Sequence, residues 1–193
     1  MLQKSLPADL PTTHGHFKVI AYKDDERGEH LAVLKGEPTE NAVVRIHSQC
    51  ITGDALTSQR CDCGEQLDLS LKKIAQEGGI LLYLQQEGRG IGLFNKIAAY
   101  HHQDRGLDTV EANHKLGFQD DVRSYSIAAK ILKDLGIRSI SLLTNNPRKV
   151  QGLENYGIII NERIPVLVKT NTANRNYLAA KQKKLGHHLK VLK

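Results

Sequence analysis

Residues 42–85 have the sequence AVVRIHSQCITGDALTSQRCDCGEQLDLSLKKIAQEGGILLYLQ, which contains two predicted strands with a helix between them. Residues 42–48 are rich in β-branched side chains, which favours a strand. From Glu65 to Glu77 leucine and isoleucine recur at helical spacing, and two glycines then end the helix. ILLYLQ (80–85) is a continuous apolar run, typical of a buried strand. Because strands that alternate with helices form parallel or mixed sheets, we expect such a sheet here.

The flanking sequence continues this alternation. FKVIAY (17–22) and HLAVLKG (30–36) are short runs bounded by turn residues, which predicts a β-rich N-terminal half. The fold class that follows is α/β, a mixed sheet with covering helices, and one compact domain is the simplest expectation for 193 residues. C-terminal to residue 85 we expect a helix through Phe94 and Ile97 to about His102, a helix from about Asp121 to Gly136, a strand at 139–143 and a short helix through 150–157. The turn before this last helix caps it, with Asn146 preceding Pro147 at the first helical position.

The net charge of +6 is concentrated near the C-terminus. Between Arg163 and Lys193 there are eight Lys or Arg residues and no Asp or Glu, so the preceding chain carries more acidic than basic residues. A nucleic-acid-binding protein would spread its cations along a face with aromatic residues between them. We therefore expect a solvated tail or helix at 171–193 and no nucleic-acid partner.

The distribution of apolar residues predicts a soluble protein. The N-terminal residues MLQKSLPADLPTTHGHF contain no apolar signal core, and no window approaches the roughly 18 apolar residues of a membrane span. The clustered, odd number of cysteines argues against a secreted disulfide scaffold. We expect a cytoplasmic protein with no membrane partner.

The three cysteines, Cys50, Cys61 and Cys63, have the spacing C-x10-C-x-C. Catalytic zinc usually keeps three protein ligands, whereas structural zinc has four, and no fourth cysteine is present. Our main expectation is one zinc per chain in an open site, in a loop directly after a strand. A closed site that includes His47, buried cysteines without a metal, and a disulfide with one spare thiol are the alternatives.

Four polar segments in predicted loops each contain at least one cation: Arg45, Arg89, Arg123 and Lys149. If these four cations converge on one site, that site suits a polyphosphate, because each guanidinium group can donate two parallel hydrogen bonds to phosphate oxygens. Any one of them alone is more often a surface ion pair. The glycines in EGRGIG (87–92) indicate a tight turn, but their spacing matches neither the P-loop nor the dinucleotide-binding motif.

Four longer stretches carry a family resemblance. GDALTSQRCDCGEQL (53–67), QQEGRGIGL (85–93), NKIAAYHHQDRGLDTVEANHKLGF (95–118) and LLTNNPRKV (142–150) resemble the motifs of GTP cyclohydrolase II. The resemblance extends over about residues 10–170. It implies a catalytic domain at 1–170 that acts as a homodimer. The implied reaction of riboflavin biosynthesis hydrolyses GTP to formate, pyrophosphate and 2,5-diamino-6-(5-phosphoribosylamino)pyrimidin-4(3H)-one, with Mg2+ beside zinc.

The resemblance also implies individual roles. Tyr100, Asp121 and Arg123 would be catalytic, with Asp121 a general base and Arg123 a nucleophile toward the α-phosphate. Because its hydroxyl is a neutral donor, we expect Tyr100 to hydrogen-bond either the opening ring or the formyl intermediate. A guanidinium is protonated at ordinary pH, so we favour Arg123 as a cation that stabilises charge on the transferring phosphoryl group. Asp121 would then either activate water or orient Arg123. Asp121 could also be a charge at a helix N-terminus. The implied zinc ligands are Cys50, Cys61 and Cys63, and the implied GTP contacts are Arg45, Ile46, His47, Ser48, Gln49, Gln66, Glu87, Gly88, Arg89, Thr109, Thr144 and Lys149.

One residue departs from the family pattern, and other functions stay open. Gln49 stands where we expect Glu before the first cysteine, so a charge is absent there. A variant that performs only part of the reaction and a zinc-stabilised nucleic-acid-binding protein are the alternatives. A nucleobase deaminase is disfavoured, because the pattern H-x-E…P-C-x-x-C is absent.

Overall fold

The computed structural model describes residues 2–26, 28–168 and 170–187. The chain divides into two compact units, each assembled from three segments. Unit 1 comprises Met1–His47, Leu67–Gln85 and Ser124–Val166, and unit 2 comprises Ser48–Gln66, Gln86–Arg123 and Leu167–Lys193. The expected domain boundary at residue 170 stays a prediction. No helix in the described part of the chain has the length and apolar character needed to cross a membrane.

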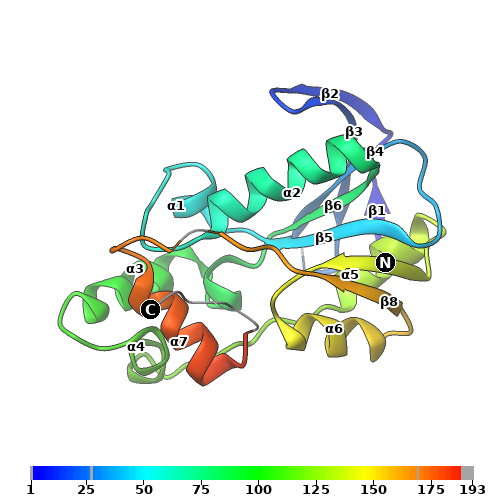
Figure 1. Cartoon of the computed structure of the whole chain (residues 1–193). Helices are drawn as coiled ribbons and strands as arrows, with labels where there is room; N and C mark the ends of the chain where they lie inside the picture. Colours follow the sequence, from blue (N-terminus) through cyan, green and yellow to red (C-terminus); the bar gives the residue numbers. More distant parts are fainter. Residues whose placement is uncertain (1, 27, 169, 188–193) are drawn as a thin grey trace. The chain divides into compact units, whose positions relative to one another are not determined.

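Unit 1 is built on an eight-stranded mixed sheet (Figure 1). The strand order is β1-β3-β4-β6-β5-β7-β8, and β2 pairs with β3 outside this path. The pairings from β1 to β6 are antiparallel, whereas β5 with β7 and β7 with β8 are parallel, which confirms the predicted mixed sheet. The strands are β1 (Gln3–Lys4), β2 (Ala8–Thr12), β3 (Gly15–Lys23), β4 (Glu29–Lys35), β5 (Ala42–Ser48), β6 (Gly79–Leu84), β7 (Ser139–Leu143) and β8 (Ile159–Ile164).

Helices cover both faces of this sheet. Successive side chains of a strand point to opposite faces, and apolar side chains of the central strands are buried on both. On one face Leu82 packs in a cluster with the apolar side chains of α5 (Ser126–Asp134) and with Leu153 of α6 (Pro147–Glu154). On the other face Leu81 packs with Ile74 of α2 (Cys63–Glu77). β6 is therefore apolar on both faces, which is why it appears in the sequence as a continuous apolar run.

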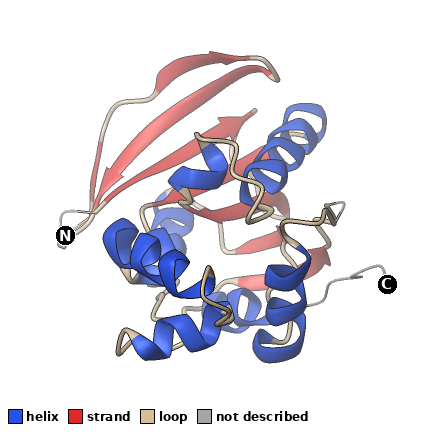
Figure 2. Cartoon of the chain, turned by 90° about the vertical axis from the view of Figure 1, so that its left-hand side faces the viewer, coloured by secondary structure: helices blue, strands red, loops and turns tan. Residues whose placement is uncertain are grey.

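Apart from Ser48, the last residue of β5, the regular elements in the described part of unit 2 are all helices, and loops connect them (helices blue, strands red and loops tan in Figure 2). It contains the first turn of α2 and ends with a helix in the basic segment, where a tail or helix was predicted. α4 starts with a capping box, in which Asp108 accepts from the backbone of Val110 and Glu111. The other elements are α1 (Ile51–Asp54), η1 (Glu87–Gly90), α3 (Gly92–Gln103), α4 (Thr109–Lys115) and α7 (Arg175–Leu185).

One predicted helix start is wrong, and another is confirmed. The helix expected from about Asp121 is α5, which begins at Ser126. The Asp121 carboxylate accepts from the backbone N–H of Arg123 at 3.1 Å, and such a local bond favours a turn over a helix. Asp121 is therefore not a charge at a helix N-terminus. The short helix expected through 150–157 is α6, which starts at Pro147 with Asn146 as its cap, as predicted, and ends at Glu154.

Candidate metal centre and active site

The three cysteines meet in unit 2, and their sulfur atoms all lie within 4.8 Å of one another. Cys50 lies between β5 and α1, while Cys63 is the first residue of α2. The Sγ atoms of Cys50 and Cys61 are 3.6 Å apart. Tetrahedral zinc with Zn–S bonds of about 2.3 Å would hold two sulfurs about 3.8 Å apart, so the donor set fits zinc. Among the described residues this group of potential metal ligands includes no histidine.

Two glycines allow the cysteine loops to approach each other. A Cβ on Gly53 would lie 2.8 Å from the sulfur of Cys61 and 3.3 Å from that of Cys50. A Cβ on Gly64 would lie 2.4 Å from the carbonyl oxygen of Gly53. Real Cβ atoms do not tolerate such distances, so α1 and the start of α2 can pack this closely only with glycine at both positions. The close packing around the sulfurs therefore explains the glycines at the two ends of GDALTSQRCDCG (53–64).

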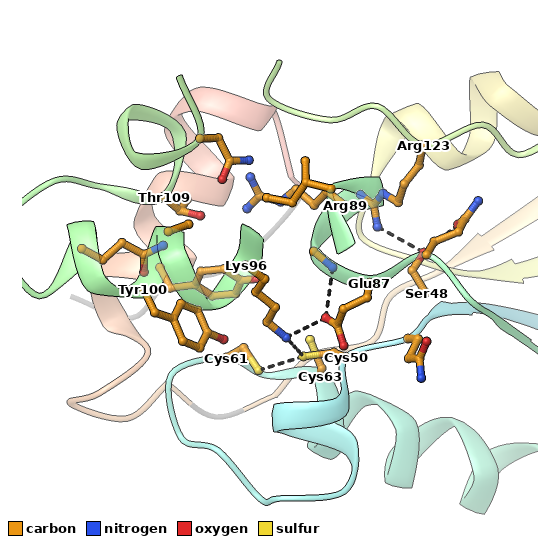
Figure 3. Close-up of a pocket in the computed structure, with 18 residues that line it drawn as sticks. Ser48, Cys50, Cys61, Cys63, Glu87, Arg89, Lys96, Tyr100, Thr109 and Arg123 are labelled. Carbon is orange, nitrogen blue, oxygen red and sulfur yellow. Dashed lines mark hydrogen bonds and ion pairs between the residues drawn. The ribbon is translucent and has the colours of Figure 1, made fainter. Parts of the chain in front are cut away.

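Lys96 of α3 is a buried cation beside the cysteines that sequence analysis did not identify (Figure 3). Its Nζ donates to Cys50 Sγ at 3.0 Å, to Thr52 Oγ1 at 2.9 Å and to Glu87 Oε1 at 2.7 Å. A lysine ammonium has three N–H donors, so these bonds satisfy all of them. Lys96 thus acts within the protein and has no donor left for a ligand.

The Glu87 carboxylate is equally occupied. Its Oε1 accepts from Lys96 and from the backbone N–H of Gly88 at 3.0 Å, and its Oε2 accepts from the backbone N–H of Ile51 at 2.7 Å. Glu87 thereby connects η1 to α1 and to α3. The described bonds give Glu87 a structural role, and its implied contact with GTP stays a prediction.

The charge state of this cluster is set by its own members. Hydrogen bonds from the thiols of Cys61 and Cys63 lower the pKa of Cys50, and the Lys96 ammonium adds to this effect. The hydrogen bond to Cys50 and burial raise the pKa of Cys61 to about 11. Burial alone would lower the pKa of Lys96, but Glu87 and Cys50 raise it, so Lys96 keeps its charge. The Lys96 ammonium therefore favours the thiolate form of Cys50.

Tyr100 lies one turn after Lys96 on α3, so both side chains point to the same side of the helix. Its hydroxyl is 3.3 Å from Thr52 Oγ1, and the Arg60 guanidinium lies 4.8 Å from the centre of its ring. Burial raises the pKa of Tyr100, which keeps the hydroxyl protonated as a donor. The structure thus brings this predicted catalytic side chain to the metal centre.

Arg123 and Asp121 form a second polar group in unit 2. The Asp121 carboxylate accepts from Arg123 Nε at 2.8 Å and from Nη2 at 2.6 Å, while Arg123 Nη1 donates to Ser48 Oγ at 3.2 Å. Although burial alone would raise it, the hydrogen bonds and charge of Arg123 lower the pKa of Asp121. This two-bond arrangement fixes the plane of the guanidinium. Asp121 is thus placed to orient Arg123.

The turn at η1 brings Arg89 next to this group. Gly88 and Arg89 both have φ of 62°, and such a conformation is uncommon for a residue with a side chain. The carbonyl of Arg89 accepts from the backbone N–H of Val122 at 3.2 Å, and a Cβ on Gly90 would lie 2.7 Å from the Val122 side chain. The predicted tight turn is confirmed, and it juxtaposes the segments that contain Arg89 and Arg123.

These groups line one pocket of unit 2, which opens to solvent and encloses about 590 Å³ of space when the open solvent at its mouth is included (Figure 3). Predicted site residues that line it are Ser48, Gln49, Cys50, Cys61, Cys63, Glu87, Gly88, Arg89, Tyr100, Thr109 and Arg123. Further lining residues that we did not predict are Gln86, Ile91, Lys96, Ala99, Gln103, Asn113 and Tyr177. Gln66 does not line the pocket; its amide donates to Asp62 between two of the cysteines.

The other predicted GTP contacts belong to unit 1, around the ends of the parallel strands β5 and β7. Arg45 Nη1 donates to the carbonyl of Leu143 at 3.0 Å, and Lys149 Nζ donates to the carbonyl of Ile46 at 2.7 Å. Thr144 follows β7 and accepts from the backbone of Asn146, while the ring of His47 stacks on Tyr83. The structure therefore brings Arg45, Ile46, His47, Thr144 and Lys149 to one end of this sheet, and their contact with GTP stays a prediction.

Comparison with known proteins gives a consistent result. A family model described as GTP cyclohydrolase II matches residues 3–165. "Riboflavin biosynthesis protein RibBA" of Thermotoga maritima is 55% identical over 194 residues, which cover 100% of this chain and 50% of the relative. The protein of the same name from Bacillus velezensis is 52% identical, covering 98% and 49%, and that from Chlorobium phaeovibrioides is 50% identical, covering 97% and 47%.

The chain thus spans about half the length of the curated relatives that it matches. The family match extends over both compact units, including the three cysteines and the segment that contains Asp121 and Arg123. Because it covers most of the sequence, the chain belongs to the GTP cyclohydrolase II family.

Proposed function

We propose that this chain catalyses the zinc- and Mg2+-dependent hydrolysis of GTP in riboflavin biosynthesis. The reaction opens the guanine imidazole ring at C8 and releases formate and pyrophosphate, giving 2,5-diamino-6-(5-phosphoribosylamino)pyrimidin-4(3H)-one. The observation that supports this best is the pocket of unit 2, in which three cysteine sulfurs and two arginines line the same cavity. A metal site suits ring opening, and guanidinium groups suit a polyphosphate.

The cysteine side of the pocket would carry out the ring opening. Cys50, Cys61 and Cys63 would hold one zinc per chain, and a zinc ion there would supply Lewis-acid activation of the water that attacks C8. Lys96 would stabilise the thiolate form of Cys50, since it donates directly to that sulfur. The protonated hydroxyl of Tyr100 would donate a hydrogen bond to the opening ring.

The arginine side would bind the phosphates. Arg123 is oriented by two hydrogen bonds that it donates to the Asp121 carboxylate, and Arg89 lies on the adjoining turn. We propose that Arg123 stabilises charge on the transferring phosphoryl group, and that Mg2+ enters with GTP. The carboxylate of Asp121 would hold the guanidinium in place, because both of its oxygens accept from Arg123.

Product analysis tests the proposed function. Zinc-loaded protein is incubated with GTP and Mg2+, and formate, pyrophosphate and the pyrimidine product are measured. Equal amounts of formate and pyrophosphate support the full reaction, whereas a product that retains the formyl group indicates the partial-reaction variant. Unchanged GTP together with salt-dependent binding of nucleic acid would reject the proposal in favour of the binding protein.

The two chemical steps can be separated in the same assay. Cys61→Ser removes a zinc ligand but leaves Arg123 and Asp121 intact. We expect this variant to stop formate release and still release pyrophosphate, so that guanosine monophosphate accumulates. If the variant binds GTP and no guanosine monophosphate forms, the steps are coupled and the proposed separation is wrong.

We propose further that the protein acts as a cytoplasmic homodimer. α3 exposes three large apolar side chains, Leu93, Phe94 and Ile97, and Phe94 is 86% exposed. Apolar side chains grouped in this way favour a protein contact. Phe94→Glu should shift the sedimentation coefficient toward that of a monomer, whereas Leu6→Glu, at another exposed leucine, should leave it unchanged. A monomeric wild-type protein would reject this assignment.

A further inference from the structure

The basic C-terminal segment contains a helix whose position in unit 2 suggests a role in the pocket. The family model ends at residue 165, and α7 lies beyond it. Sequence analysis treated this segment as a solvated tail or helix. In the structure Tyr177 of α7 lines the pocket together with Cys61, Cys63 and Arg89.

A buried ion pair connects α7 to the cysteine loop. Lys181 Nζ lies 2.8 Å from Asp62 Oδ1, and Asp62 is the residue between Cys61 and Cys63. Asp62 is 2% exposed and Lys181 is 9% exposed. Breaking a buried pair on one side leaves an uncompensated charge, so such a contact holds its two segments together strongly. The charge of Lys181 keeps the pKa of Asp62 low although burial would raise it.

A second set of ion pairs connects α7 to α4. Lys184 contacts the carboxylates of Asp108 and Glu111, which form the capping box of α4. α4 in turn supplies Thr109 and Asn113 to the pocket. α7 therefore contacts two of the segments that build the pocket wall, and it does so through two lysines of the basic segment.

Tyr177 is held in place by the same helix. Lys181 lies one turn after it, and the Lys181 ammonium is 4.3 Å from the centre of the Tyr177 ring. Burial raises the pKa of Tyr177 to about 12, so the ring carries a neutral hydroxyl. An aromatic ring in this pocket offers a flat surface in the same cavity as the groups proposed for ring opening and for phosphate binding. Aromatic rings stack well on nucleobases.

We propose that α7 is a structural wall of the nucleotide pocket and that the ring of Tyr177 is a substrate contact for the nucleoside part of GTP. The proposal rests on the proposed function, because it takes a guanine nucleotide as the ligand. Tyr177 is a binding residue, whereas Lys181 and Asp62 position it by holding α7 to the cysteine loop.

The test measures binding of a non-hydrolysable α,β-methylene analogue of GTP to the zinc-loaded, full-length protein. Tyr177→Leu should weaken binding about tenfold, because one lost base–aromatic contact has this order of effect. Its zinc content should equal that of the wild type. Tyr177→Phe should bind like the wild type, since it keeps the ring. Tyr156→Leu is the matched control, because Tyr156 lies outside the pocket in unit 1.

The positioning role has its own readout. Lys181→Met should weaken analogue binding as Tyr177→Leu does, and it should also speed proteolysis of the C-terminal segment. Lys181→Met leaves the Asp62 carboxylate buried without its cation, and this unpaired charge could itself unfold the loop. The double variant Lys181→Met/Asp62→Asn also removes the ion pair but leaves no unpaired carboxylate. Adding Tyr177→Leu to Lys181→Met or to Lys181→Met/Asp62→Asn should weaken analogue binding little further, since all of these substitutions act through the contact of the Tyr177 ring.

The outcomes separate this inference from the proposed function. If wild-type protein neither binds the analogue nor consumes GTP, the proposed function fails. If wild-type protein binds the analogue and Tyr177→Leu binds it equally well, only the inference fails. An equal loss of binding in Tyr177→Phe and Tyr177→Leu would also overturn the ring contact.

Discussion

Replacing Lys96 by methionine should strongly destabilise unit 2. Methionine has a similar length and keeps the apolar contacts of the lysine stem, but it has no N–H donor. The substitution therefore removes three hydrogen bonds at once, to Cys50, Thr52 and Glu87. The Glu87 carboxylate would stay buried without its cation, and the Cys50 thiolate would lose its ammonium.

The size of the effect follows from burial. The side chains of Lys96 and Glu87 are 10% and 8% exposed, so solvent screens their interaction weakly. Removing one partner of such a pair costs about 3–5 kcal/mol in the free energy of unfolding. An exposed pair costs about 0–1 kcal/mol. Since proteins of this size are stable by about 5–15 kcal/mol, the single variant should lose a large share of its stability.

A double-mutant cycle isolates the pair. Urea unfolding of wild type, Lys96→Met, Glu87→Gln and the double variant is followed by circular dichroism at one fixed zinc concentration, and the zinc content of each protein is measured. The double variant should be more stable than Lys96→Met, because no buried carboxylate remains unpaired. Lys72→Met is the control, since Lys72 forms an exposed pair with Asp68. A cost below about 1 kcal/mol for Lys96→Met at unchanged zinc content would refute the reasoning.

Three further changes have defined outcomes. Cys61→Ser should lower the zinc content from about one per chain toward zero while circular dichroism stays native, because the sheet of unit 1 has its own core; global unfolding would indicate a structural metal. Arg123→Lys should slow pyrophosphate release about 10²–10³-fold and not abolish it, as lysine keeps the charge and loses the fork; a guanylylated Arg123 peptide in rapidly quenched wild-type enzyme would instead establish the covalent role. Hydrogen bonds from Lys4 and Tyr22 lower the pKa of Asp134 although burial would raise it, so its contribution to stability is present above pH 3.8 and lost as the pH falls through the lowered pKa. Acid titration of Asp134→Asn should lack this component, and equal acid sensitivity of the two proteins would contradict it.

Periodicity predicted the elements that bury an apolar face. β6 and α2 have side chains in the two clusters of the core, and both were expected within two residues of their observed bounds. β8 was missed because most of its side chains are exposed, so its sequence lacks an apolar alternation. The start of α4 depends on the capping box at Asp108, a polar feature that apolar spacing does not detect.

The candidate site was predictable where residue type alone indicates chemistry. Three clustered cysteines indicate a metal site by themselves, whereas the arginines were singled out by their co-occurrence with that site and by the family motifs. Lys96 was missed although it lies within one of those motifs, because a lysine inside a helix is usually solvated and only tertiary packing buries this one. Tyr177 was missed because it lies in a basic segment with no apolar pattern, and its place in the pocket depends on ion pairs with residues distant in sequence.

The charges of the pocket suggest how GTP would be oriented. With zinc bound, three thiolates give the metal centre a formal charge of −1, and the buried pair of Lys96 and Glu87 adds no net charge beside it. On the other side of the pocket the charge of Arg123 is balanced by Asp121, which leaves the positive charge of Arg89. A triphosphate is repelled by the first side and attracted by the second. The guanine base would therefore face the cysteines, as ring opening at C8 requires.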